Sequence, residues 1–132
     1  MEQESSVSEQ LSQKEILEKT FELFYHYALS VVGAKKTDSL LKTTYESVQS
    51  YYPNISQIKL IQDHQIHFEE EEITEKEILG LAIWLQQFLT AIKNFMIGLG
   101  KVDAQSITIN IHDQLEPLNF YEFFEQAKEL IS

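Results

Sequence analysis

The stretch from Ile78 to Leu99, ILGLAIWLQQFLTAIKNFMIGL, constrains this chain more than any other part of its sequence. It contains no acidic residue and one basic residue, Lys93, in a protein whose formal net charge is −11. A helix that is apolar on nearly every side has to be surrounded by protein or by lipid. The stretch therefore predicts the centre of the core, and it predicts a helix that is covered on more than one side.

A membrane-spanning helix is the alternative interpretation of this stretch, which is long enough to cross a bilayer. Polar side chains interrupt its middle and second half, at Gln86, Gln87, Thr90, Lys93 and Asn94. A lysine at the centre of a membrane helix costs about 2.5 to 3.5 kcal/mol on insertion scales. We therefore expect no membrane insertion, and we place this helix inside a folded domain.

The composition excludes several classes of function. The chain has 132 residues, of which 43% are hydrophobic, and this is enough for one domain with its own core. It has no cysteine, which rules out disulfides and cysteine-ligated metals and fits a cytoplasmic protein. All ten basic residues are lysines, and an acidic chain without arginine repels phosphate backbones. We expect no nucleic-acid partner and no cofactor.

Helix-capping patterns divide the chain into elements. Residues 1–11 are polar and predicted to be frayed, and residues 12–132 are predicted to form a single domain. Ser12 with Glu15 forms a capping box, and it opens a helix that closes at Gly33. A second helix begins at Thr37 or Ser39 and is stopped by Pro53. Capping boxes at Thr74 and Asn119 open the central apolar helix and the last helix.

Alternation of apolar and polar residues predicts three strands. Ile58 and Leu60 alternate with Gln57, Lys59 and Gln62 before a turn at Asp63 and His64. Ile66 and Phe68 alternate with Gln65 and His67 after it, which is typical of a hairpin. Ile107, Ile109 and Ile111 alternate in the same way and predict a third strand. The expected order is α-α-β-β-α-β-α. The fold class is α/β of the α+β type, a two-layer domain with a small antiparallel sheet covered by the central helix and by flanking helices.

The central helix has more apolar surface than a small sheet can cover. Its broadest face can pack on the sheet, but Ile83, Trp84, Ala91 and Ile97 lie on the other side. The first and last helices could cover these side chains within one chain. A second copy of the chain could do so as well, because twofold dimers are the commonest oligomers. We favour a homodimer from the sequence.

The histidines offer one candidate site. His67 and His112 would share the polar face of the sheet with Lys59, if the strands pair as expected. Two histidines beside a lysine, with no carboxylate at a suitable spacing, make a poor zinc site. We expect these histidines to be solvent-facing strand residues, and we expect no metal.

The densest charge in the sequence lies at Glu69, Glu70, Glu71 and Glu72, hereafter the acidic run, which is followed by Glu75 and Glu77. One interpretation is a docking patch for a basic partner. The other is a solvated strand end, followed by acids that stabilise a helix N-terminus by about 0.3 to 1 kcal/mol each. The second interpretation suffices for Glu75 and Glu77.

No catalytic arrangement can be assembled from these residues, so we expect the protein not to be an enzyme. We predict a small acidic regulatory or adaptor protein in signalling that acts through protein–protein contacts. The candidate partner-binding residues are Glu69, Glu70, Glu71, Glu72, Trp84, His67 and His112. One alternative is a ligand-sensing module that holds a small apolar molecule around Phe68, Trp84 and Phe88. A third is a secretion-type chaperone for a client protein.

Overall fold

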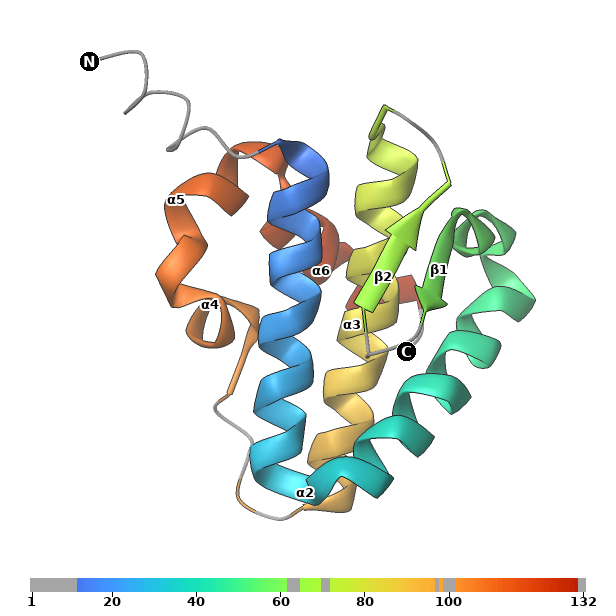
Figure 1. Cartoon of the computed structure of the whole chain (residues 1–132), viewed down its shortest axis with the longest axis vertical. Helices are drawn as coiled ribbons and strands as arrows, with labels where there is room; N and C mark the ends of the chain where they lie inside the picture. The colour runs from blue at the N-terminus through green and yellow to red at the C-terminus, as the bar shows by residue number, and fades with distance from the viewer. Residues whose placement is uncertain (1–11, 62–64, 70–71, 97, 99–101, 131–132) are drawn as a thin grey trace.

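A computed structural model describes residues 12–61, 65–69, 72–96, 98 and 102–130 of the chain. These residues form a small α+β domain, in which helices dominate and the sheet is a single antiparallel hairpin (Figure 1). The elements are α2 (Gln13–Tyr51), η1 (Pro53–Gln57), β1 (Ile58–Ile61), β2 (Gln65–Phe68), α3 (Glu75–Phe95), α4 (Ala104–Ile107), η3 (Ile109–Ile111), α5 (His112–Leu115), η4 (Glu116–Leu118) and α6 (Phe120–Leu130).

Helix α2 is bent sharply at Gly33. Its N-terminus is the predicted capping box, in which the Ser12 side chain accepts from the Glu15 amide and the Glu15 side chain accepts from the Ser12 amide. At Gly33 the backbone has φ 85° and ψ 169°, a conformation open essentially to glycine alone. The helix resumes directly after it and ends before Pro53. The predicted interruption is confirmed, and its effect is a V-shaped helix (Figure 1).

Helix α3 is the predicted apolar helix and it lies at the centre of the molecule. The capping box of Thr74 and Glu77 begins it as expected. It ends at Phe95, earlier than the predicted Leu99, and Leu99 lies outside the described residues. Within the described part of the chain, no helix is long and apolar enough to cross a membrane.

The predicted hairpin is confirmed and lies against the helices, while its predicted turn at Asp63 and His64 lies outside the described residues. Ile58 is opposite Phe68 and Lys59 is opposite His67. Ile58, Ile66 and Phe68 are almost completely buried, whereas Lys59 and His67 are exposed. The period-two pattern therefore separates a core-facing side from a wet side, as it does in sheets with one covered face.

The prediction of a third strand at Ile107, Ile109 and Ile111 is wrong. Residues 104–115 fold into short helical turns, and the sheet has two strands among the described residues. Asp103 begins these turns, because its side chain accepts from the Ser106 amide at 2.9 Å. The buried positions are Ala104, Thr108, Ile111 and Leu115. Their spacing of four, three and four residues is helical, and it is a better guide here than the alternation of isoleucines.

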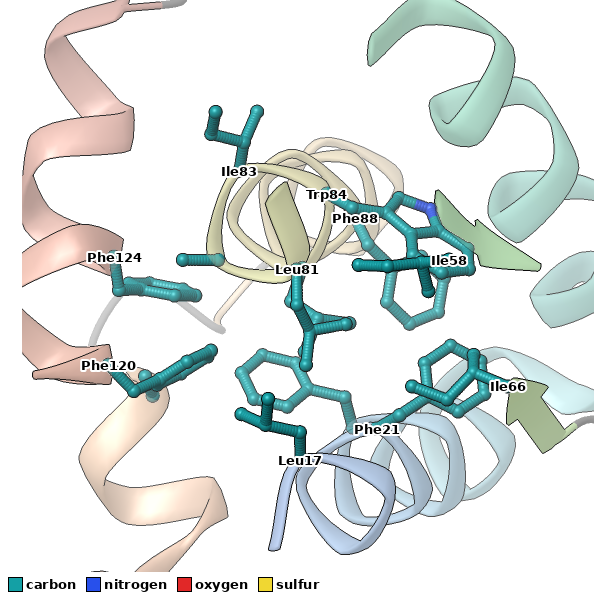
Figure 2. Packing of buried hydrophobic residues seen from close by; sticks show 14 of the residues in the cluster. Leu17, Phe21, Ile58, Ile66, Leu81, Ile83, Trp84, Phe88, Phe120 and Phe124 are labelled. Atoms are coloured by element: carbon teal, nitrogen blue, oxygen red, sulfur yellow. The ribbon is translucent and has the colours of Figure 1, made fainter. Parts of the chain in front are cut away.

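One continuous core surrounds α3 (Figure 2). Trp84 has no exposed surface and lies between the two arms of α2, 5.3 Å from Phe21 and 5.0 Å from Tyr45 between ring centroids. On the other side, Phe120 and Phe124 of α6 point toward α3 in Figure 2. The apolar surface of α3 at Ile83 and Trp84 is therefore covered within a single chain.

Candidate functional site

The N-termini of α2 and α3 lie at the same end of the molecule (Figure 1). Helix N-termini favour carboxylates, because the unpaired amides there carry partial positive charge. Glu15 and Glu77 meet this need directly through the two capping boxes. Glu77 is also buried. These two acids have a structural role, and the sequence interpretation of Glu77 is confirmed.

The described acids of the acidic run behave differently. Glu69 and Glu72 are exposed, and neither side chain makes a hydrogen bond or ion pair with any residue that the structure describes. Glu70 and Glu71 lie outside the described residues. Within the described part of the chain, the fold does not use the carboxylates of Glu69 and Glu72, unlike those that cap the helices.

A second acidic surface lies beside the hairpin, where sequence reasoning found none. A hollow of about 220 Å³ separates the first arm of α2 from β2. It is lined by Glu18, Glu22, Gln65, Ile66 and His67, and we call it the α2–β2 groove. Glu18 and Glu22 are one helical turn apart on α2, so their side chains project on the same side. Their spacing is visible in the sequence, but only the folded chain shows that β2 lies opposite them.

Glu18 is held in an unfavourable position for a charge. Partial burial raises the pKa of its carboxyl above the usual value, and the neighbouring charges of Glu15 and Glu22 raise it further. Lys14 and His67 act in the opposite direction. Among the described residues, no hydrogen bond or ion pair to the Glu18 side chain offsets this. A cation supplied from outside would relieve it.

The two histidines do not meet on one face of a sheet. His67 is exposed on β2 in the α2–β2 groove, whereas His112 lies on α5, because the predicted third strand is helical. His112 stacks on Tyr121 with ring centroids 5.2 Å apart, and its Nδ1 is 3.6 Å from a carboxylate oxygen of Asp113. In the part of the chain that the structure describes, no three His, Asp or Glu residues are placed to hold a metal ion.

Trp84, also predicted to bind a partner, is not on the surface. Its indole Nε1 donates to Thr44 Oγ1 at 3.1 Å, so both the ring and its polar atom are satisfied inside the core. Its side chain offers a partner no surface. Phe68 and Phe88 are buried as well, and none of the three lines the α2–β2 groove. The ligand-sensing alternative stays a prediction.

Comparison with known proteins gives no further guide to this surface. No family model, curated protein or solved structure matches the chain.

Proposed function

We propose that this chain is a small acidic regulatory or adaptor protein, without enzymatic activity, that works in the cytoplasm through contacts with a basic protein partner. The observation that carries the proposal is the contrast among its acids. Glu15 and Glu77 are used by the fold, whereas Glu69 and Glu72 are exposed and have no described partner. Surface charge that the fold does not use contributes most to steering and orienting a charged partner.

The location of the acidic run supports this assignment. It links β2 to α3, two elements that are anchored in the core by Phe68 and Ile78. Docking residues on a connection between rigid elements are the usual arrangement of binding sites on small domains. Glu72 lines a hollow with Ser12 at the end of the molecule where α2 begins, so Glu15 and Glu75 add to the negative potential there.

A pair of neutralised variants tests the proposal. One replaces Glu69, Glu70, Glu71 and Glu72 with glutamine. The matched control makes the same charge change on the exposed residues Asp113, Glu116, Glu122 and Glu125, replacing them with asparagine or glutamine. Both variants and the parent chain are used to capture proteins from a cell extract, and the retained proteins are quantified by mass spectrometry at low and high salt.

We expect basic proteins to be retained by the parent chain and by the control at low salt, and to be lost from the variant of the acidic run. The dependence on salt follows from screening, because the Debye length falls to about 3 Å at 1 M salt. Equal retention by all three chains would contradict the assignment of the acidic run. Turnover of a substrate by the purified chain would contradict the non-enzymatic part of the proposal.

A further inference from the structure

A single residue joins the two arms of α2. The first arm, residues 13–32, and the second arm, residues 34–51, are helical, and only Gly33 between them is not. Helices that fold back on each other are usually joined by a loop of about two to five residues. A Cβ added at Gly33 meets no atom within 4 Å, so packing at this position does not hold the bend. Rotation of two dihedral angles at Gly33 is enough to make α2 one continuous helix.

The hydroxyl of Thr37 lacks a hydrogen bond because of the bend. Thr37 is completely buried, and its Oγ1 has no partner among the described residues. Each of the other buried threonines in the described part of the chain donates to the carbonyl four residues earlier: Thr20 to Ile16 at 2.8 Å, Thr44 to Leu40 at 2.7 Å and Thr108 to Ala104 at 2.7 Å. For Thr37 that carbonyl belongs to Gly33, whose ψ of 169° turns it out of the helical direction. A continuous α2 would restore this hydrogen bond.

Opening of α2 removes the first arm from the core of its own chain. Phe21 and Phe24 on this arm are buried almost completely, and they pack on Trp84 of α3 and Phe124 of α6 with ring centroids 5.3 and 5.9 Å apart. A monomer with a straight α2 would expose both sides of this contact to water, which the hydrophobic effect strongly opposes. The first arm of a second copy carries the same side chains and fits the vacated site.

We propose that Gly33 is a hinge at which α2 opens into one helix, and that two opened chains exchange their first arms to form a domain-swapped dimer. The exchange keeps every contact of the first arm but makes it to the other copy, so little stability is lost. A short hinge favours the exchange, because the closed form needs a tight turn that the open form does not.

The position of the hinge fits the exposed apolar surface of α3. The Lys36 Nζ lies 4.4 Å from the centre of the Phe95 ring, so the hinge is beside the end of α3. Phe95 and Met96 are exposed there. Two chains that cross at Gly33 meet at this end, and the new contacts between them can cover these side chains.

One consequence of the exchange rests on the proposed function, although the exchange itself does not. A swapped dimer carries two copies of the acidic run. A partner with two basic segments can engage both copies at once, and its avidity then exceeds the affinity for a single run by about a hundredfold or more. The test of the hinge uses no partner, so its result is separate from that of the proposed function.

Spin labels report the state of the hinge, because the chain has no cysteine of its own and labels attach only where one is introduced. The labelled pair is Lys19→Cys/Gln49→Cys, at exposed positions on the two arms. Labelled chain is diluted with unlabelled chain so that only distances within one chain are recorded. A continuous helix separates the two positions by about 45 Å, and the bent helix brings them closer. The control pair Gln13→Cys/Ser30→Cys lies on the first arm and stays at about 26 Å in both forms.

Three chains are compared by this distance and by light scattering after size exclusion: the parent, Gly33→Ala, and a chain with Gly-Ser-Gly inserted after Gly33. Alanine disfavours the bend and favours a continuous helix. We expect Gly33→Ala to shift from 15.4 kDa toward twice that mass at lower protein concentrations than the parent, with the long distance. In the dilute protein used for denaturation it remains a bent monomer. The insertion supplies a relaxed loop, so that chain should stay monomeric with the short distance.

The parent chain provides a second measurement that holds even if Gly33→Ala does not fold. After refolding from urea at high protein concentration, it should contain a dimer with the long distance. This dimer should persist on dilution, because return to the monomer requires the first arm to leave the core. A dimer that shows only the short distance would be held by surface contacts and would overturn the inference. A refolded parent that stays at 15.4 kDa at every concentration would also overturn it.

Discussion

Trp84 joins the central helix α3 to both arms of the bent helix α2. Phe21 lies on one arm of α2 and Tyr45 on the other, and Thr44 accepts the indole hydrogen bond. Each contact depends on the bend at Gly33, because a straight α2 could not approach Trp84 from two sides. The ring is therefore the point at which both arms of α2 meet α3.

We predict that Trp84→Ala lowers the free energy of unfolding by about 3 to 5 kcal/mol, because it removes a completely buried aromatic ring. Urea denaturation followed by far-ultraviolet circular dichroism measures the change. Thr44→Val is the companion variant: it keeps the ring but removes its acceptor, and it should cost about 1 to 3 kcal/mol. A stability unchanged in Trp84→Ala would mean that α3 does not occupy the centre of the core.

Glu18 gives a prediction whose sign depends on pH. Its pKa is raised above 4.5 in the folded chain, chiefly by burial, so the folded state holds the proton more tightly than the unfolded state. Ionisation of Glu18 thus opposes folding, and its contribution to stability decreases as the pH rises through the range above 4.5.

We expect Glu18→Gln to be more stable than the parent chain at pH 7, by less than about 0.5 kcal/mol for a side chain this exposed. The difference should disappear at about pH 3.5, where the parent carboxyl is protonated. Urea titrations of both proteins at the two pH values measure this, with Glu46→Gln at an exposed site on α2 as the control. Greater stability of the parent at pH 7 would contradict it.

At the scale of an element, the segment from Ala104 to Leu115 shows where local pattern and fold disagree. Ile107, Ile109 and Ile111 alternate like strand residues, but Ile109 is 64% exposed and Ile111 is 8% exposed. On a strand these two side chains would face the same way and be buried alike. In the helical turns Ile111 faces the core and Ile109 does not.

The matched variants Ile109→Ala and Ile111→Ala distinguish the two structures of this segment. We predict that Ile111→Ala lowers the free energy of unfolding by about 2 to 4 kcal/mol, as a buried truncation does. Ile109→Ala should change it by no more than about 0.5 kcal/mol, as an exposed substitution does. Equal and large losses of unfolding free energy in the two variants, measured by chemical denaturation, would contradict the helical turns and support the strand.

The bend in α2 makes a similar prediction at Gly33. A Cβ added there meets no atom within 4 Å, so any cost of Gly33→Ala comes from the backbone alone. The observed dihedral angles are strained for alanine by about 1 to 3 kcal/mol. We expect that loss in urea denaturation, and a change below about 0.5 kcal/mol for Ser39→Ala at an exposed site on the other arm. A stability unchanged in Gly33→Ala would mean that the bend does not need glycine.

At the scale of the whole molecule, the question is how α3 is covered. The homodimer expected from the sequence rested on Ile83, Trp84, Ala91 and Ile97. Ile83 and Trp84 are completely buried within one chain and Ala91 is partly exposed, whereas Ile97 lies outside the described residues. The exposed apolar surface of α3 is at its C-terminal end, where Phe95 is 51% exposed and the following Met96 is 36% exposed. The Lys36 Nζ lies 4.4 Å from the centre of the Phe95 ring, and this cation–π contact places a charged group over the exposed ring.

The homodimer therefore stays a prediction, and we place its contact surface at this end of α3. Light scattering after size exclusion over a range of concentrations measures the mass. For a dimer held there, Phe95→Ser/Met96→Ser should shift the mass toward that of the monomer, 15.4 kDa. A parent chain that stays at this mass at every concentration would contradict the homodimer.

The sequence determined those features that neighbouring residues control by themselves. The capping boxes at Ser12 and Thr74, the interruption at Gly33 and the hairpin pairing all depend on backbone groups within a few residues of one another. The hydrophobicity of α3 placed the core correctly, because a helix with no polar face has to be buried. The sequence showed the acidic run as four consecutive glutamates, without showing which of these side chains are exposed.

Only the tertiary structure decided what covers α3 and what faces the α2–β2 groove. The bend at Gly33 brings both arms of α2 onto Trp84, so this side chain is covered within one chain. Glu18 and His67 are far apart in sequence and meet only because β2 lies along α2. Such contacts depend on the directions that elements take after they leave a turn, and local side-chain periodicity does not encode those directions.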